Sequence, residues 1–252
     1  MIIKRTQRYY FILLFTALLL SAFNAYSQSI SIGIFHNSKQ KKATIRVIHG
    51  KYEIIANDRI TRALISGDSI IIESSLNRVV VRNGRDTSSF NQLLIRGTMG
   101  TNIFEIKPAD PLLKKRIYDD DLIISSVNGF LSFVNDVDFE KYIAGVIESE
   151  GGHLAPMEYY KVQAILCRTY SMKYIEKHAQ EGFSLCDKVH CQAYTNKCVK
   201  NPDIIKATQE TAGLVIVDST ISVISALFFS NSGGQTVNSE DVWTKKLDYL
   251  RS

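Results

Sequence analysis

The first half of the chain alternates apolar and polar positions with the two-residue period of β-strands. The alternating segments and short apolar runs lie at residues 30–34, 45–47, 52–54, 70–72 and 79–81. No cluster of titratable residues stands out in this region. We therefore interpret residues 28–117 as a β-rich scaffold, the alternative being a surface that binds a glycan or a partner.

Asn-Gly pairs mark two turns between such strands, because these residues accept the positive φ angles of tight hairpins. Asn83-Gly84 follows the apolar run at 79–81. Asn128-Gly129 lies between residues 122–127 and 130–134, so these two segments are predicted to form a hairpin.

The apolar pattern changes to a helical period after residue 137. Apolar side chains recur at three- and four-residue spacing from Phe139 to Ile147, and therefore line one face of a helix. The same spacing returns from Tyr159 to Tyr170, after Pro156, where a helix can begin without losing a hydrogen-bond donor.

A third helix is predicted over residues 203–212, with Asn201-Pro202 at its start and Gly213 at its end. Residues 214–217 and 222–229 are predicted to be strands. The pattern as a whole predicts an α+β fold, in which the β-rich N-terminal region packs with a mixed helix and strand region, residues 118–252.

The chain begins with the pattern of a signal peptide. Basic residues at Lys4, Arg5 and Arg8 precede an apolar run, Tyr9 to Leu20, and small residues suited to cleavage end at Ser27. We expect removal of residues 1–27, export to the periplasm or cell surface, and no stable membrane span after cleavage. The alternative is an uncleaved membrane anchor.

The charge of the chain argues against nucleic acid as a partner. The formal net charge is +5, but three of the basic residues lie in the predicted signal peptide and no sustained basic stripe follows. A nearly neutral exported protein is compatible with action on the cell wall or another extracellular polymer.

The segment between the first two helices holds the candidate catalytic residue. Glu148 and Glu150 lie at the end of the first helix and are followed by Gly151-Gly152. Two residues apart on a helix, the carboxylates point in different directions, so they cannot form a close pair. We expect Glu148 to be solvated.

Five motifs in order carry a resemblance to a known family. They read VNDVDFEKYIAGVIESE, APMEYYKVQAILCRTYS, CDKVHCQAY, ATQETAGLVI and FFSNSGGQT. Together they resemble the sporulation stage II protein D family (SpoIID/LytB-like) over about residues 118–252. Gly151-Gly152 stands where the family usually has Met-Pro. Relatives usually continue beyond Ser252, which is compatible with either a fragment or a truncated form.

The resemblance implies a peptidoglycan lytic transglycosylase with Glu150 as its single acid/base and with a glycan groove. Such an enzyme cuts between N-acetylmuramic acid and N-acetylglucosamine and leaves 1,6-anhydro ends. Glu150 must begin protonated, which a partly apolar site favours. Arg168 has two interpretations, a buried structural anchor or a contact to the sugar. The candidate substrate-binding residues are Gln163, Arg168, Tyr170, Gln192, Ser230, Ser232, Gly233 and Gly234.

Two histidines and two cysteines have a spacing that suits a structural zinc ion. They are His178, Cys186, His190 and Cys191. Some members of the resembled family carry zinc at a matching arrangement. The alternatives are a disulfide that involves Cys186 or Cys191, or free thiols, whereas Cys167 is predicted to be a core residue.

Two functional classes remain open on the sequence. The first is the lytic transglycosylase, whose partner is the peptidoglycan glycan strand. The second is a non-catalytic module that binds the cell wall and stimulates a partner amidase. A purely structural role is a weaker third interpretation.

Overall fold

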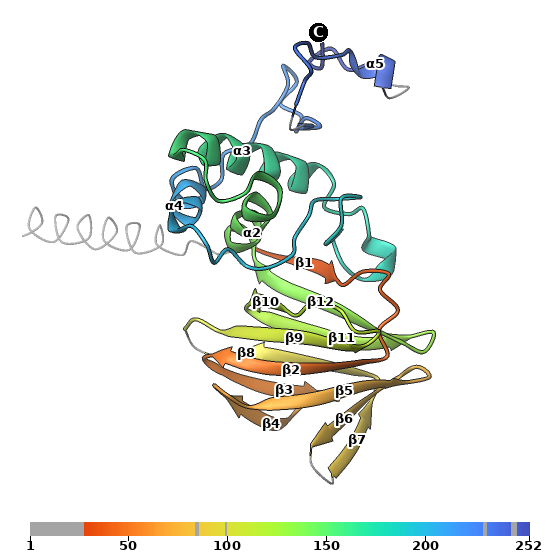
Figure 1. Cartoon of the computed structure of the whole chain (residues 1–252). Helices are drawn as coiled ribbons and strands as arrows, with labels where there is room; N and C mark the ends of the chain where they lie inside the picture. Colours follow the sequence, from red (N-terminus) through yellow and green to blue (C-terminus); the bar gives the residue numbers. More distant parts are fainter. Residues whose placement is uncertain (1–27, 84–85, 99, 229–230, 243–245) are drawn as a thin grey trace, which may run out of the picture.

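The computed structural model describes residues 28–83, 86–98, 100–228, 231–242 and 246–252. The strands of these residues form one sheet of seven strands and one of six (Figure 1). The larger has the order β13-β1-β12-β11-β8-β3-β4, and the smaller has the order β10-β9-β2-β5-β6-β7.

The strands of the larger sheet run antiparallel except for the parallel pair of β1 and β13. Their bounds are β1 Ser29–Ile34, β3 Lys51–Ala56, β4 Arg59–Ile65, β8 Gln92–Gly97, β11 Asp121–Val127, β12 Phe130–Asp138 and β13 Leu185–Cys186. The smaller, antiparallel sheet contains β2 Lys42–His49, β5 Ser69–Ser75, β6 Arg78–Asn83, β7 Asp86–Phe90, β9 Ile103–Asp110 and β10 Arg116–Asp119.

The two sheets share one apolar core. Residues that alternate along the strands, such as Ile30 and Ile32 in β1 and Ile70 and Ile72 in β5, are buried in the same cluster. This burial follows from the two-residue period, which places every second side chain on the same face.

The helices lie together on one side of the sheets (Figure 1). Helix α2 (Phe139–Gly151) follows β12 directly, and Asp138 caps it by accepting a hydrogen bond from the Lys141 backbone. The remaining helical segments are α3 (Met157–Lys173), η1 (Ala179–Glu181), α4 (Pro202–Glu210) and α5 (Ser239–Val242). Helix α2 packs against both α3 and α4, and its buried face contains the predicted apolar residues.

The predicted α+β class and the predicted hairpin are confirmed. Strands β11 and β12 pair from Asp121–Asp136 to Val127–Phe130, with the Asn128-Gly129 turn between them. Asn83-Gly84 stands between β6 and β7, which also pair, but Gly84 lies outside the described residues.

The prediction of strands over 214–217 and 222–229 was wrong for the described part of these segments. Only an isolated bridge between Val217 and Val223 links them, and residue 229 lies outside the description. The physical reason is that the first segment bonds to side chains of α3. The Leu214 carbonyl accepts from Arg168, and the Ile216 backbone N–H donates to Thr169.

The sequence analysis placed a boundary between two regions at residues 117 and 118, but both sheets contain residues from each side of it. Strand β10 contains that boundary, and β1 lies between β12 and β13. The regions 28–117 and 118–252 therefore share both a sheet and a core.

Among the described residues, no helix has both the length and the apolar character needed to span a membrane. The predicted signal peptide, residues 1–27, lies outside the described residues and stays a prediction.

Candidate functional site

Glu150 lies in the last turn of α2, where the helix reaches solvent. Its side chain is exposed, and its Oε1 accepts a hydrogen bond of 2.7 Å from the Ala193 backbone N–H. The helix ends immediately afterwards, because Gly152 has a φ of 73°, a left-handed value that glycine adopts readily. The carboxylate is therefore fixed by a helix on one side and by a loop on the other.

The two residues before Glu150 bind the same loop. Glu148 accepts hydrogen bonds from the backbone N–H groups of Val199 and Lys200, at 3.2 and 2.7 Å to Oε1. Ser149 Oγ accepts from the Thr195 backbone N–H at 3.1 Å. Glu148 is half-buried, and these backbone donors bind a carboxylate that was expected to be solvated, so it is only partly open to water.

A pocket of about 250 Å³ opens beside Glu150. Among the described residues that line it, Glu150 is the only carboxylate. Most of the lining residues are apolar or aromatic, but polar atoms make up the larger part of the exposed wall. The lining residues are Glu150, Tyr170, Val189, Cys191, Gln192, Ala226, Leu227 and Phe228. Burial raises the pKa of Tyr170, so its hydroxyl remains a protonated donor at neutral pH.

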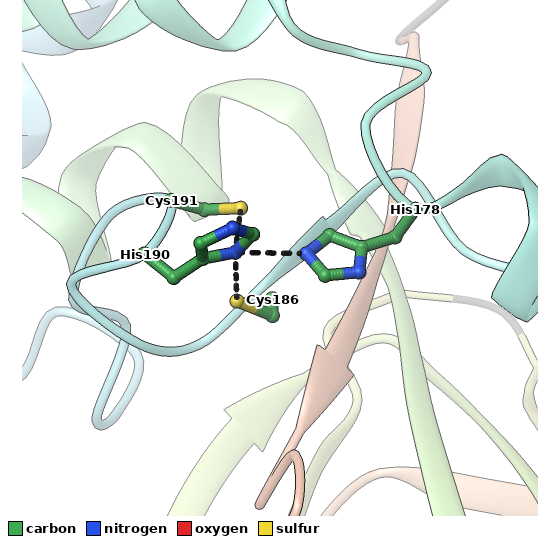
Figure 2. A group of neighbouring side chains, drawn as sticks. All are labelled: His178, Cys186, His190 and Cys191. Carbon is green, nitrogen blue, oxygen red and sulfur yellow. Dashed lines mark hydrogen bonds between the residues drawn. The ribbon is translucent and has the colours of Figure 1, made fainter.

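The four predicted metal ligands come together (Figure 2). His178 precedes η1, Cys186 ends β13, and His190 and Cys191 follow in a turn. The ligand atoms of all four lie within 4.8 Å of one another. From His190 Nδ1 the distance is 3.3 Å to His178 Nε2 and 3.8 Å to either sulfur.

These distances fit a tetrahedral zinc ion. With its usual bond lengths to nitrogen and sulfur, zinc separates neighbouring ligand atoms by about 3.3–3.8 Å. The cysteines of the described chain are unpaired, so no disulfide competes for the sulfurs here. Burial raises the pKa of Cys191 to about 11, and metal binding must therefore displace its proton. The residues present fit this ion.

Glu150 and the metal-ligand cluster fall in a region that matches known proteins. The family model for Stage II sporulation protein matches residues 128–217. Stage II sporulation protein D of Bacillus subtilis is 29% identical over 134 residues, and its namesake in Bacillus amyloliquefaciens is 27% identical over 165 residues. The family model and these two relatives support the assignment of the matched region to the SpoIID family. The family resemblance that the sequence motifs indicated is thereby confirmed.

A third relative of this chain is an uncharacterized protein of Brachyspira hyodysenteriae, 31% identical over 134 residues. The three matches cover 53%, 47% and 60% of this chain for the Brachyspira, B. subtilis and B. amyloliquefaciens relatives respectively. They cover only 36%, 39% and 46% of those relatives. The chain thus matches less than half the length of each curated relative.

Three predicted substrate contacts of the SpoIID region are buried and make internal bonds. Arg168 is 1% exposed, and its guanidinium donates to Glu140, Thr208 and Leu214. This corrects the interpretation of Arg168 as a sugar contact and matches the anchor alternative. Gln163 is buried on α3, where its Oε1 accepts from the Cys167 thiol.

Gln192 borders the pocket but is only 2% exposed. Its Oε1 accepts a hydrogen bond of 2.8 Å from Ser171, and its Nε2 donates to the Cys167 carbonyl. The amide is therefore committed to α3, so Gln192 positions the loop and does not present its amide to a ligand.

The predicted glycine-rich wall is not part of this pocket. Ser232, Gly233 and Gly234 lie in an exposed turn and do not line it. Ser230 lies outside the described residues. Of the predicted contacts, the SpoIID pocket brings Tyr170 and Gln192 next to Glu150.

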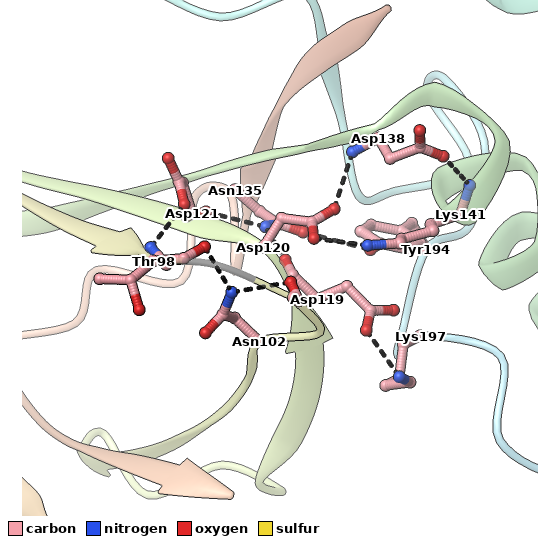
Figure 3. Close-up of polar contacts among 12 residues, drawn as sticks. Thr98, Asn102, Asp119, Asp120, Asp121, Asn135, Asp138, Lys141, Tyr194 and Lys197 are labelled. Carbon is pink, nitrogen blue, oxygen red and sulfur yellow. Dashed lines mark hydrogen bonds and ion pairs between the residues drawn. The ribbon is translucent and has the colours of Figure 1, made fainter. Parts of the chain in front are cut away.

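A polar network that the sequence analysis missed anchors the loop after Cys191 to the sheets (Figure 3). Tyr194 is buried and donates to Asn135 Oδ1, and Asn135 Nδ2 donates to the carbonyls of Asp119 and Asp121. Lys197 pairs with Asp119 at 2.6 Å. In the sequence, this network could be indicated by the Val-Asn motif before α2 and by the tyrosine after Gln192. Neither pattern shows which residue it contacts.

Proposed function

We propose that this protein is an exported lytic transglycosylase that acts on the glycan strands of peptidoglycan, with Glu150 as its acid/base. The observation that carries the proposal is that Glu150 is the single carboxylate among the described residues that line its pocket. Similarity to the SpoIID family supports a cell-wall substrate, and the predicted signal peptide supports export.

The reaction suits a site with one carboxylate. Hydrolysis of a glycosidic bond uses two, one to protonate the leaving oxygen and another to activate water or attack carbon. In a lytic transglycosylase the C6 hydroxyl of the muramic acid attacks the anomeric carbon of its own sugar. The nucleophile is already tethered, which supplies its effective concentration without a second carboxylate.

Glu150 would serve both proton transfers. The protonated acid donates to the glycosidic oxygen as that bond breaks, and the resulting carboxylate accepts the proton of the attacking C6 hydroxyl. The Ala193 N–H, 2.7 Å from Oε1, stabilises the carboxylate form between these steps. Oε2 accepts no hydrogen bond from the described residues, so it is available to the substrate.

We further propose that zinc occupies the cluster of His178, Cys186, His190 and Cys191. Four protein ligands leave no open position, so the ion would stabilise structure and would not activate water. Cys191 both belongs to the cluster and lines the Glu150 pocket, and Ala193 follows two residues later. The cluster would therefore hold the loop that donates to Glu150.

The exposure of Glu150 favours a second candidate function. An acid/base of this kind is more effective when its surroundings favour the neutral form, and an exposed carboxylate has less of that support. The same groove could bind glycan without cleaving it and stimulate a partner amidase. Product analysis separates the two candidates.

The test incubates the purified protein with glycan strands, with and without stem peptides, and analyses the products by mass spectrometry. We expect 1,6-anhydro ends from the wild type and at least a 100-fold loss in Glu150→Gln, because general acid–base catalysis contributes about 10²- to 10⁴-fold. Glu158→Gln is the matched control, since Glu158 lies on the exposed start of α3. Absence of 1,6-anhydro product from the wild type, with strands bound equally by wild type and Glu150→Gln, would leave only the binding function, and equal product from both would exclude Glu150 as the acid/base.

A further inference from the structure

A carboxylate outside the metal cluster joins two histidines. Glu181 Oε1 lies 2.5 Å from His178 Nδ1, and its Oε2 lies 2.9 Å from His36 Nε2. His178 turns its other ring nitrogen, Nε2, toward His190 in the cluster (Figure 2). One imidazole therefore contacts Glu181 with one nitrogen and faces the other ligands with the second.

This contact selects the tautomer of His178. An ionised carboxylate can only accept hydrogen bonds, so the proton of a neutral imidazole is held on Nδ1. The lone pair is then on Nε2, the atom that faces the cluster. Carboxylates that accept from the outer nitrogen of a histidine ligand orient the ring and raise its basicity toward the metal.

The position of the His178 ring is fixed by aromatic contacts as well. It stacks on Phe183, with centroids 4.9 Å apart and an interplanar angle of 23°. His36 meets the edge of the same Phe183 ring. A Cβ at Gly33 would lie only 2.6 Å from this ring, so β1 approaches Phe183 closely because it has glycine there.

The turn after β1 also contacts the metal-ligand cluster through Asp187, in addition to the contact through Glu181. The backbone N–H groups of Phe35 and His36 donate to the Asp187 carboxylate, at 2.7 and 3.2 Å. Arg116 pairs with the same carboxylate at 2.7 Å. Because Asp187 follows Cys186 directly, the turn after β1 orients a cysteine ligand through Asp187 and a histidine ligand through Glu181.

We propose that Glu181 is a positioning residue for the metal, with His36 holding its second oxygen. The inference rests on the proposed zinc site and extends it to residues 36 and 181. His36, His178 and Glu181 could instead hold an ion of their own, since their ligand atoms also lie within 4.8 Å. The 2.5 Å distance between His178 Nδ1 and Glu181 Oε1 is that of a direct hydrogen bond and leaves no room for an ion between these two atoms.

The first measurement is zinc affinity by competition with a chromophoric chelator, on the full mature chain. We expect one zinc per chain in the wild type and an affinity about 10- to 100-fold lower in Glu181→Ala. Glu181→Gln should fall between them, because its amide oxygen still accepts from Nδ1 but carries no charge. Glu176→Ala is the matched control, an exposed glutamate that has no side-chain bond among the described residues.

The second measurement reports the tautomer directly. In metal-free protein, long-range ¹H–¹⁵N correlation spectra of the His178 ring should show the Nδ1–H form in wild type. Glu181→Ala should shift the ring toward the Nε2–H form, an effect that a merely structural role would not produce. Since Glu181 is half exposed, its variants are expected to fold, which circular dichroism checks.

The outcomes separate this inference from the zinc proposal. A wild type without zinc at equimolar metal would overturn both. Zinc bound equally tightly by wild type and Glu181→Ala would overturn the inference alone. Two zinc ions in wild type and one in Glu181→Ala would make Glu181 a ligand of a second ion and would also overturn it.

Discussion

Gly145 shows how closely helix α2 approaches the loop that carries the site. A Cβ at this position would lie 2.5 Å from the Tyr194 ring and 2.7 Å from the Asn196 carbonyl. Real Cβ atoms do not approach so closely, and Tyr194 is held by its hydrogen bond to Asn135. The absence of a side chain at residue 145 is therefore what allows the helix and the loop to touch.

The corresponding prediction is that Gly145→Ala destabilises the protein. Glycine to alanine inside a helix ordinarily stabilises it by about 0.5–1 kcal/mol. Here overpacking should reverse the sign and cost about 1–3 kcal/mol of the free energy of unfolding. Urea denaturation measures this difference, and a stabilised Gly145→Ala variant would contradict the proposed packing.

At the scale of elements, the end of α2 and the loop 193–200 form one unit. Three consecutive side chains, Glu148 to Glu150, accept hydrogen bonds from backbone groups of that loop. Such bonds satisfy backbone donors in a segment that is itself neither strand nor helix.

We therefore predict that Glu148→Ala loosens the loop and destabilises the chain by about 0.5–1.5 kcal/mol, the usual net contribution of a hydrogen bond that water can replace. Hydrogen exchange should show faster exchange of the Val199 and Lys200 amides. The Ala193 amide, which bonds to Glu150, should change less. Unchanged protection at Val199 and Lys200 would show that Glu148 does not hold them.

The elements that could be predicted are those determined by residues close together in the sequence. The hairpin at Asn128-Gly129 and the start of α3 follow from turn and capping residues a few positions apart. The prediction of a strand at residues 214–217 was wrong because its apolar sequence does not reveal the partner of its backbone. That backbone bonds to side chains of α3 and not to a strand. No local pattern separates these cases.

The same limit applies to the site. The ligand spacing from His178 to Cys191 lies within fourteen residues of sequence, so the cluster was predictable. Glu181 lies within it too, but its role appears only when β1 brings His36 beside it, 145 residues away in sequence. Arg168 likewise meets Glu140 across 28 residues. Contacts of this range are set by the fold.

At the scale of the whole molecule, the cluster connects the sheets with the site. Cys186 lies on β13, which pairs with β1 in the larger sheet, and Cys191 lines the Glu150 pocket. The stretch between these cysteines has little apolar content of its own, so burial alone cannot hold its shape. A bound metal would contribute to folding here, because the ligands are brought together only in the folded state.

Metal removal should therefore act on the site as well as on stability. We predict that a chelator lowers the melting temperature of the zinc-loaded protein and speeds exchange of the Ala193 amide, which bonds to Glu150. A reductant alone should change neither, because the structure has free thiols and no disulfide to break. Calorimetry and hydrogen exchange measure the two effects, with the chelator removed and zinc restored as the control. Sensitivity to reductant with indifference to chelator would instead indicate a disulfide at Cys186 or Cys191, and the loop beside Glu150 would then be held by a covalent bond.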